Sequence, residues 1–254
     1  FKSYNWNILT IDGHNHDEID KAIVKAKSSD KPTLICCKTK IGFGSPNKES
    51  KSSSHGSPLG SEEIELTRKN LNWDHDQFMI PDDLLEQWRG FSKKNIETKN
   101  KWENKNKDFL NSGDFKKFFN LKLEDKTKEE IVNFKKTYAA DESKYATRKA
   151  SEKSLELLNN HIQNFIGGSA DLTGSNNTKT SEMGIFNADN YNGSYVYYGI
   201  REHAMAGVMN GLALHGGIRA YGGTFLVFSD YCRPSIRLAA LMNIPVIYVM
   251  THDS

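Results

Sequence analysis

The sequence predicts an α/β fold, in which short parallel strands alternate with helices. Two apolar runs, at 32–37 and 245–250, have the length of buried strands. Between such runs apolar residues recur at helical spacing, and strands that alternate with helices imply a parallel sheet with both faces covered. Hydrophobic residues make up 37% of the 254 residues and charged residues 26%, which is typical of a globular chain.

The opening of the chain is expected to be the end of an α/β domain, followed by a loop. Apolar residues at helical spacing predict a helix over 17–28, and the run 32–37 predicts a buried strand. The thiols of Cys36 and Cys37 are therefore expected to be buried and inert. From 43 to 60 the composition turns to Gly, Pro, Ser and Lys, which predicts a loop, and loops of this length are often functional.

The middle of the chain predicts a series of helices. Ser61 and the two glutamates after it favour a helix start, with the hydroxyl as its cap. A second helix is expected over 82–111, and Thr127 with Glu130 forms a capping-box pattern before a third. The stretch 87–136 is rich in Lys, Glu and Asn, and it is typical of a solvated connector without chemistry.

A second α/β unit is expected toward the C-terminus. Its predicted elements are a helix over 147–164, strands over 165–168 and 195–198, a helix from 201, a strand over 218–222, a helix over 229–242 and a strand over 245–250. Ligands of such sheets bind at the carboxyl ends of the strands. The residues just after these strands or at helix starts are Asp171, Glu202, Phe225 and His252. They are therefore candidates for a ligand site.

Glu202 stands at the start of an alanine- and glycine-rich helix, directly after a short strand. A glutamate among small apolar residues is costly to bury in its ionised form. Such an environment suits a carboxyl that shares a proton with a ligand nitrogen. The alternative is a first-turn glutamate that only favours the helix dipole. Spacing alone leaves both interpretations open.

Seven blocks of sequence, in the same order along the chain, resemble the transketolase family. They are Lys38–Lys48, Ser54–Gly60, Ala146–Ala150, Gly167–Leu172, Tyr198–Gly217, Thr224–Phe228 and Thr251–Ser254. An ordered series is far more specific than any single motif. The resemblance covers essentially the whole chain and is weakest over 72–138. Because family subunits are more than twice this length, the chain is expected to be an internal piece of such a subunit.

The resemblance implies a thiamin-diphosphate-binding fold with three segments. Residues 1–60 would be the C-terminal part of the diphosphate-binding domain, 61–137 a helical linker, and 138–254 the pyrimidine-binding domain, truncated at its C-terminal end. The family's metal-binding Gly-Asp-Gly motif does not occur in the sequence. The ligands of the divalent ion, Mg²⁺ or Ca²⁺, are therefore expected outside this chain.

The activity implied is transfer of a two-carbon ketol unit from a ketose phosphate (xylulose 5-phosphate) to an aldose phosphate (ribose 5-phosphate or erythrose 4-phosphate). This is a reaction of the pentose phosphate pathway, carried out by a homodimer with its active site at the subunit interface. Three alternatives stay open: dihydroxyacetone synthase, 1-deoxyxylulose-5-phosphate synthase, and a scaffold subunit that has lost catalysis. The second of these matches poorly at 54–60 and 146–150.

The same resemblance implies roles for individual residues that bind the cofactor. Glu202 would act on the pyrimidine ring as the catalytic acid, and the family holds that ring with aromatics that match Phe225, Phe228 and Tyr231. From the residues alone, these three rings at spacing three could equally be core. Asp171 and Leu172 would also lie near the cofactor, although Asp171 could be a simple turn residue.

Other residues are expected to meet the substrate. Arg148, Ser175 and His252 would bind its phosphate, since a guanidinium, a hydroxyl and an imidazole can all donate to phosphate oxygens. His55 is expected to be catalytic and to contact both substrate and cofactor, although a lone loop histidine is often only solvated. Ile41 is expected to touch the cofactor.

Composition excludes several other classes of partner. The net charge of +2 argues against nucleic acid or a charged membrane surface, which select large fields of one sign. The sequence has no apolar run near the length needed to span a bilayer. The three cysteines, Cys36, Cys37 and Cys232, lack metal-ligand spacing, and their odd number favours a reducing cytoplasm.

Overall fold

The computed structural model describes residues 1–253. The chain separates into two compact units, Phe1–Ile96 and Glu97–Ser254. The division falls inside the helix Asp82–Lys105 and so differs from the three segments expected from the sequence. Those three segments stay a prediction about the domains of the whole subunit.

The first unit contains a βαβ motif. Strands β1 (Asn7–Asp12) and β2 (Thr33–Lys38) pair in parallel, and helix α1 (His16–Lys27) connects them. The side chain of Asn15 caps α1 by accepting hydrogen bonds from the amides of Asp17 and Glu18 at 3.1 and 3.2 Å. The sequence analysis predicted α1 and β2 correctly and missed β1, whose short run carries polar residues at both ends.

The expectation that Cys36 and Cys37 are buried is wrong: both are exposed. Their strand, β2, is partly buried in its first half and exposed in its second. Among residues 1–253, β1 and β2 pair only with each other, so the sheet has two strands and the second half of β2 is left accessible to solvent.

Two predicted helix caps are also wrong. Helix α2 (Ser61–Asn70) has Gly60 as its cap residue, with φ 89°, so Ser61 is already helical and its hydroxyl caps nothing. Helix α6 (Asp125–Ala140) begins before Thr127, which is buried and donates from its hydroxyl to the His161 carbonyl at 3.3 Å. Ser61 and Thr127 are residue types that often cap helices, but neither stands at the cap position of its helix.

A series of helices leads into the second unit. They are α3 (Asp82–Lys105), α4 (Lys107–Asn111), α5 (Gly113–Phe119), α6 and α7 (Thr147–His161). The single helix expected over 82–111 is interrupted at Asn106. No helix among residues 1–253 is long and apolar enough to cross a membrane.

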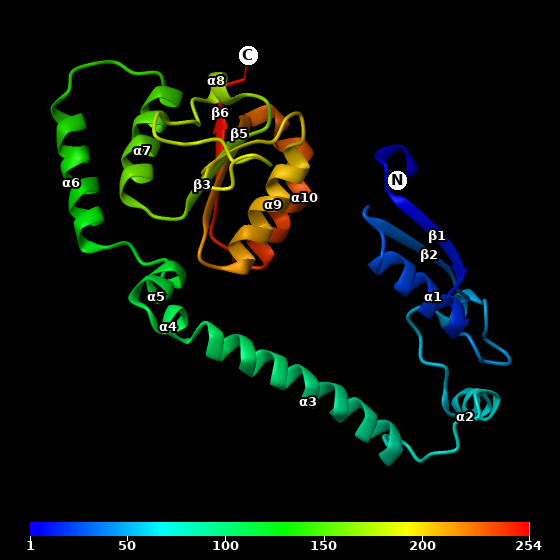
Figure 1. Ribbon diagram of the computed structural model, residues 1–254. Coiled ribbons are helices and arrows are strands. Elements are labelled where there is room, and N and C mark those ends of the chain that lie inside the picture. Colours follow the sequence, from blue (N-terminus) through cyan, green and yellow to red (C-terminus); the bar gives the residue numbers. More distant parts are fainter. Residues whose placement is uncertain (254) are drawn as a thin grey trace. The chain divides into compact units, whose positions relative to one another are not determined.

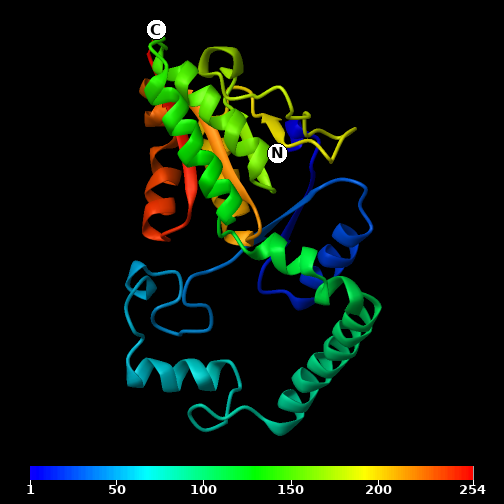
Figure 2. The same cartoon turned by 90° about the vertical axis from the view of Figure 1, so that its left-hand side faces the viewer.

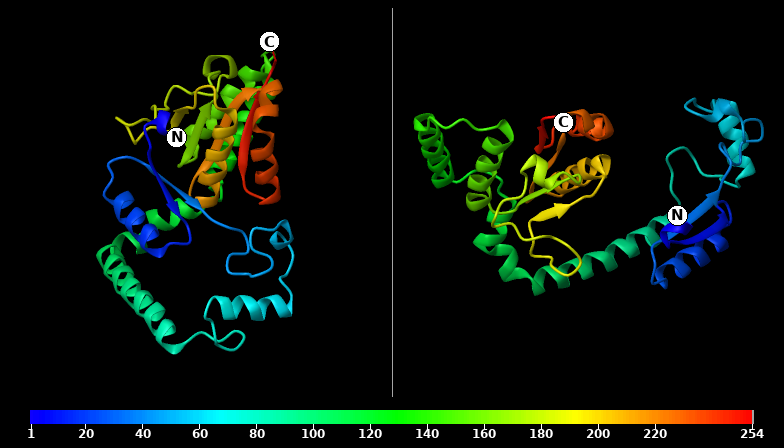
Figure 3. Two further views of the ribbon diagram at one scale, coloured as in Figure 1. Left: turned by 90° about the vertical axis from the view of Figure 1, so that its right-hand side faces the viewer. Right: turned by 90° about the horizontal axis from the view of Figure 1, so that it is seen from above.

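The core of the second unit is a parallel four-stranded sheet in the order β4-β3-β5-β6. The strands are β3 (Phe165–Ser169), β4 (Tyr195–Tyr197), β5 (Arg219–Phe225) and β6 (Val246–Thr251). Helices α9 (Glu202–His215) and α10 (Ser229–Leu241) cover one face, and α7 covers the other (Figures 1 and 2). The left panel of Figure 3 views the sheet from the side of α9 and α10. The predicted α/β fold is confirmed.

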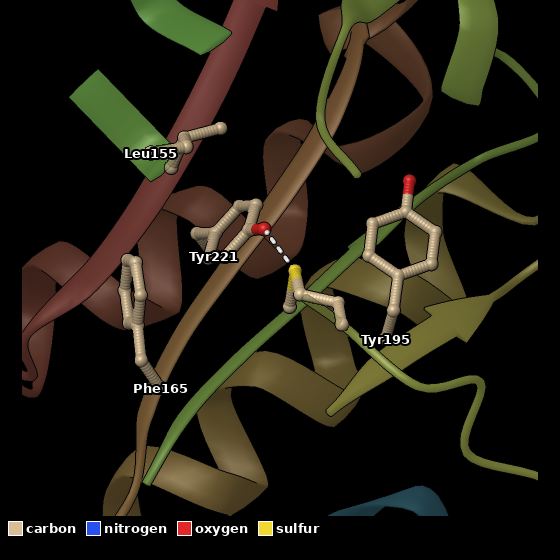
Figure 4. Close-up of a cluster of buried hydrophobic side chains, with 5 residues drawn as sticks. Leu155, Phe165, Tyr195 and Tyr221 are labelled. Carbon is tan, nitrogen blue, oxygen red and sulfur yellow. Dashed lines mark hydrogen bonds between the residues drawn. The ribbon is translucent and has the colours of Figure 1, made fainter. Parts of the chain in front are cut away.

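Buried side chains fill both faces of this sheet. On one face Leu155, Phe165, Met183, Tyr195 and Tyr221 form a cluster, drawn in Figure 4, where the dashed line marks the contact of the Tyr221 hydroxyl with the Met183 sulfur. On the other face Met205 and Met209 of α9 pack with Ala170 and Ala220. Both faces of the sheet are therefore packed, and the loops at the carboxyl ends of the strands start from a well-packed sheet.

Candidate functional site

The candidate site lies at the carboxyl edge of the four-stranded sheet. There β3 leads into the short helix α8 (Thr173–Asn176), β4 into α9, β5 into the 3-10 helix η3 (Leu226–Phe228), and β6 into His252. Figure 1 shows α8 and the end of β6 at the same end of the sheet. Parallel strands all deliver their following residues to one edge, which is why ligands bind there.

Glu202 is the first residue of α9 and is only 8% exposed. Among residues 1–253, no hydrogen bond or ion pair to its carboxylate is found. The guanidinium of neighbouring Arg201 is turned to the Tyr198 carbonyl at 2.8 Å. Burial, with the nearby charge of Glu202, raises the pKa of the Cys232 thiol. A mostly buried carboxyl group without a protein partner is costly, so a ligand that forms a hydrogen bond with it would be bound favourably.

Three aromatic rings form a column near α9, the helix that begins with Glu202. Phe225 stacks on Phe228, and Phe228 on Tyr231, each pair with ring centroids 5.9 Å apart and interplanar angles of 22° and 26°. Phe225 is 9% exposed and Tyr231 62%, so the column runs from the core to the surface. The predicted spacing thus does place the rings on one side, where they offer an apolar wall to a flat ligand.

The aromatic column is tied to the end of β6. The ring of His252 lies edge-on to Phe225 at 5.1 Å, and the Asp253 carboxylate accepts a hydrogen bond from the Val227 amide at 2.7 Å. This bond satisfies an amide in η3, the turn that carries Phe228. The loops after β5 and β6 are therefore held together.

Arg148, Ser175 and His252 come together in space although they are far apart in sequence. Arg148, in the first turn of α7, has its Nη1 3.0 Å from His252 Nε2 and donates to the Ser175 carbonyl at 3.4 Å. The arginine and the serine are half-buried, and the histidine is exposed. A guanidinium and an imidazole that meet in this way, beside the Ser175 backbone, can both donate to one anion.

Asp171 and Leu172 follow β3 at the same edge. Asp171 is exposed and has a φ of 60°, a left-handed conformation that few residues other than glycine adopt. The Leu172 amide donates to the Ser169 hydroxyl at 3.3 Å. The turn that they form leads directly into α8, so Asp171 serves as a turn residue whatever else it contacts.

A buried polar network underlies the site, and the sequence analysis missed it. The Ser169 hydroxyl lies 3.0 Å from both the Asn176 side-chain oxygen and the Gly223 carbonyl, and the Asn176 amide nitrogen bonds the Thr251 hydroxyl. These contacts join β3, β5 and β6 with α8. The only available signal was that Asn176 and Thr251 flank two residues already expected in the site, Ser175 and His252.

His55 and Ile41 belong to the first unit, so the expected site residues are divided between the two units. Both are exposed. The loop that carries them is organised by Glu63, which is only 7% exposed and accepts bonds from the Ser45 hydroxyl and from the Asn47 amide at 2.8 Å. The Ser45 bond, followed by those from Asn47, lowers the pKa of Glu63 to about 2.

No cluster of three or more metal-ligating side chains occurs among the residues that the structure describes. The site of the second unit brings together the mostly buried Glu202, the aromatic column, and the pair of Arg148 and His252. Such a set fits an organic ligand with a heteroaromatic ring and a phosphate-bearing substrate beside it.

Comparisons with known proteins agree with this arrangement. Residues 1–129 match the family model described as the transketolase thiamine diphosphate binding domain, and residues 143–254 match the transketolase pyrimidine binding domain. Curated transketolases of Cereibacter sphaeroides and Rhodobacter capsulatus are each 46% identical over 257 residues and match the whole chain. The chain spans 38% of the length of these relatives.

Solved structures give the same result. Transketolase from Leishmania mexicana matches with a TM-score of 0.82 and 32% identity, over 100% of this chain and 38% of its own. A Pichia stipitis transketolase solved with sedoheptulose 7-phosphate matches with a TM-score of 0.81 and 32% identity, over 100% and 39%. Since the two family models together match nearly the whole chain, the chain belongs to the transketolase family.

Proposed function

We propose that the subunit containing this chain is a transketolase that transfers a two-carbon ketol unit from a ketose phosphate to an aldose phosphate. Xylulose 5-phosphate would be the donor, and ribose 5-phosphate or erythrose 4-phosphate the acceptor, within the pentose phosphate pathway. The observation that carries the proposal is the buried, unpartnered Glu202 carboxylate at the same sheet edge as the aromatic column and the Arg148–His252 pair.

The residues present fit thiamin diphosphate. Glu202 lacks a partner within the described chain, and a ring nitrogen of an aminopyrimidine can accept a hydrogen bond from a carboxyl group in its protonated form. The column of Phe225, Phe228 and Tyr231 offers stacking surface to such a ring. When bound, the cofactor supplies a carbon nucleophile and an electron sink for the ketol unit.

Glu202 would act on the pyrimidine ring as the catalytic acid, through its carboxyl group. Its position as the first residue of α9, only 8% exposed, would set where that carboxyl group lies. His55, on the loop of the first unit, is proposed to move protons to and from sugar hydroxyls, since an imidazole titrates near neutral pH. Ile41, Asp171 and Leu172 are proposed to line the cofactor without taking part in proton transfer.

Substrate phosphate is proposed to bind at Arg148, Ser175 and His252. Arg148 supplies a charged fork of donors, and His252 Nε2 already lies 3.0 Å from it, so both groups can reach one phosphate. The consequence is a preference for phosphorylated sugars over free sugars.

The remaining parts of the proposal concern the whole subunit. We expect a homodimer with the active site at its interface, and Mg²⁺ or Ca²⁺ held by residues outside this chain. A cytoplasmic location is proposed from cysteine usage, because Cys36, Cys37 and Cys232 are all unpaired. No feature of the site favours dihydroxyacetone synthase, 1-deoxyxylulose-5-phosphate synthase or a silent scaffold.

Substitution of Glu202 tests the proposal. In the full-length subunit, Glu202→Ala should lower kcat about 10²- to 10⁴-fold with saturating cofactor, the usual contribution of a positioned acid–base group. Glu129→Ala is the matched control, because Glu129 is an exposed glutamate on α6. Near-normal turnover of the Glu202 variant would remove this residue from the mechanism. Tight cofactor binding without turnover of any sugar pair would point to the scaffold.

A further inference from the structure

We propose that Asn176 is a positioning residue for the phosphate site. It touches no substrate in this account, but it holds Ser175 and His252 at the separation needed to bind one phosphate group. The inference rests on the proposed function of Arg148, Ser175 and His252, and it adds a residue to which neither the resemblance nor the spacing of the sequence had given a role.

The first argument is connectivity. Asn176 is fully buried, with 0% exposure, and its side-chain oxygen lies 3.0 Å from the Ser169 hydroxyl. Its amide nitrogen donates to the Thr251 hydroxyl. One side chain therefore links the ends of β3 and β6, and its neighbour in the chain on one side is Ser175, while the neighbour of Thr251 is His252.

The second argument is that α8 is too short to be stable without contacts to the rest of the protein. It has four residues and is followed by the cap residue Asn177, which has a φ of 53°. A single helical turn is not stable by itself, so side-chain contacts must fix it. Thr173, the first residue of α8, and Thr178, just after the helix, lie 2.9 and 2.7 Å from the Tyr195 hydroxyl, and Asn176, the last residue of α8, forms the buried contacts described above. Without Asn176, the segment that bears Ser175 would keep its flanking contacts and the 3.4 Å contact of Arg148 with the Ser175 carbonyl, but it would lose its link to β6.

The third argument is that both polar atoms of the Asn176 side chain are hydrogen-bonded within the protein. Its oxygen and its nitrogen each have a protein partner, and the side chain is closed off from solvent. It can therefore affect substrate only through its neighbours. This distinguishes it from Ser175 and His252, which are half-buried and exposed and can reach a ligand.

The test compares a phosphorylated with an unphosphorylated donor in the full-length holoenzyme. Asn176→Ala and the milder Thr251→Val should each raise KM for xylulose 5-phosphate roughly tenfold, as expected for loss of a buried hydrogen bond that sets the site's geometry. KM for xylulose and kcat for both donors should change less than twofold. Thr251→Ser, which keeps the hydroxyl, should retain the KM of the wild type.

A direct binding measurement separates this inference from the proposed function. Inorganic phosphate is titrated by calorimetry into the cofactor-loaded enzyme, with Arg148→Ala to identify the site. Roughly tenfold weaker binding in Asn176→Ala and Thr251→Val supports the inference even if no sugar transfer occurs, in which case only the proposed function fails.

Three results would overturn the role of Asn176. One is an equal loss of kcat/KM for xylulose and its phosphate, which indicates general damage to the fold. Another is unchanged phosphate affinity in both variants. The third is wild-type enzyme that binds no phosphate at all, which contradicts the phosphate site together with its positioning residue.

Discussion

Gly223 of β5 faces the segment that carries Ser175, and its replacement by alanine gives a defined perturbation. A Cβ at this position would lie 2.5 Å from Thr178 Cγ2 and 3.5 Å from the Asn176 Cβ and side-chain oxygen. Carbon atoms in contact prefer about 3.5–4.0 Å. Thr178 would therefore have to move by about 1 Å.

That movement is resisted by two hydrogen bonds. The Thr178 hydroxyl lies 2.7 Å from the Tyr195 hydroxyl, and the Thr178 carbonyl accepts from the Tyr221 hydroxyl at 2.7 Å. Overpacking of a well-packed core costs about 1–3 kcal/mol. Gly223→Ala should thus lower the free energy of unfolding by this amount, and it should also raise KM for the phosphorylated donor because α8 is displaced.

Gly211→Ala is the control for this substitution. Gly211 lies within α9, and a Cβ there would meet nothing within 4 Å. Alanine in a helix is favoured over glycine by up to about 1 kcal/mol, so this variant should be as stable as the wild type or more so. Urea unfolding and steady-state kinetics of the full-length variants measure both effects. Equal stability of the two variants would refute the close contact at Gly223.

Two further predictions concern the phosphate site and the loop of the first unit. Arg148→Ala should raise KM for a phosphosugar roughly 10- to 100-fold, since hydrogen bonds to charged groups contribute about 1.5–3 kcal/mol. KM for the free sugar, measured in the same steady-state assay, should change little. Equal increases in KM for both sugars would exclude a phosphate role for Arg148. The pKa of Glu63 is lowered from 4.5 to about 2, so its support of the loop is fully present above about pH 4.5 and is lost as pH falls through about 2. At neutral pH, Glu63→Gln should speed hydrogen exchange over 41–55 and Glu62→Gln, at an exposed position, should not; unchanged exchange in the first variant would contradict the role of Glu63.

The parallel sheet of the second unit could be predicted because its signals are local. Each strand is a short run between helical patterns. The spacing of three residues between Phe225, Phe228 and Tyr231 predicts a shared side, and the rings do stack although they lie on β5, η3 and α10. The strand β1 escaped prediction because its run is short and polar at both ends. The predictions that Ser61 and Thr127 cap their helices were wrong. Gly60, with a positive φ, is the cap residue of α2, and α6 already begins at Asp125.

Contacts between distant residues could not be derived from local patterns. Arg148 and His252 are 104 residues apart, and Asn176 and Thr251 are 75 apart, so only the assembled sheet brings either pair together. The resemblance suggested the first pair and was silent on the second. Exposure of Cys36 and Cys37 likewise depends on how many strands flank β2, which no local pattern encodes.

The most direct test of the central claim is a coupled assay of the full-length protein with xylulose 5-phosphate and ribose 5-phosphate. It is run with and without thiamin diphosphate and Mg²⁺. The account predicts sedoheptulose 7-phosphate only when the cofactor is present, and its loss in Glu202→Ala. Absence of product with the cofactor tightly bound, across the donor and acceptor sugars named above, would contradict the proposed reaction.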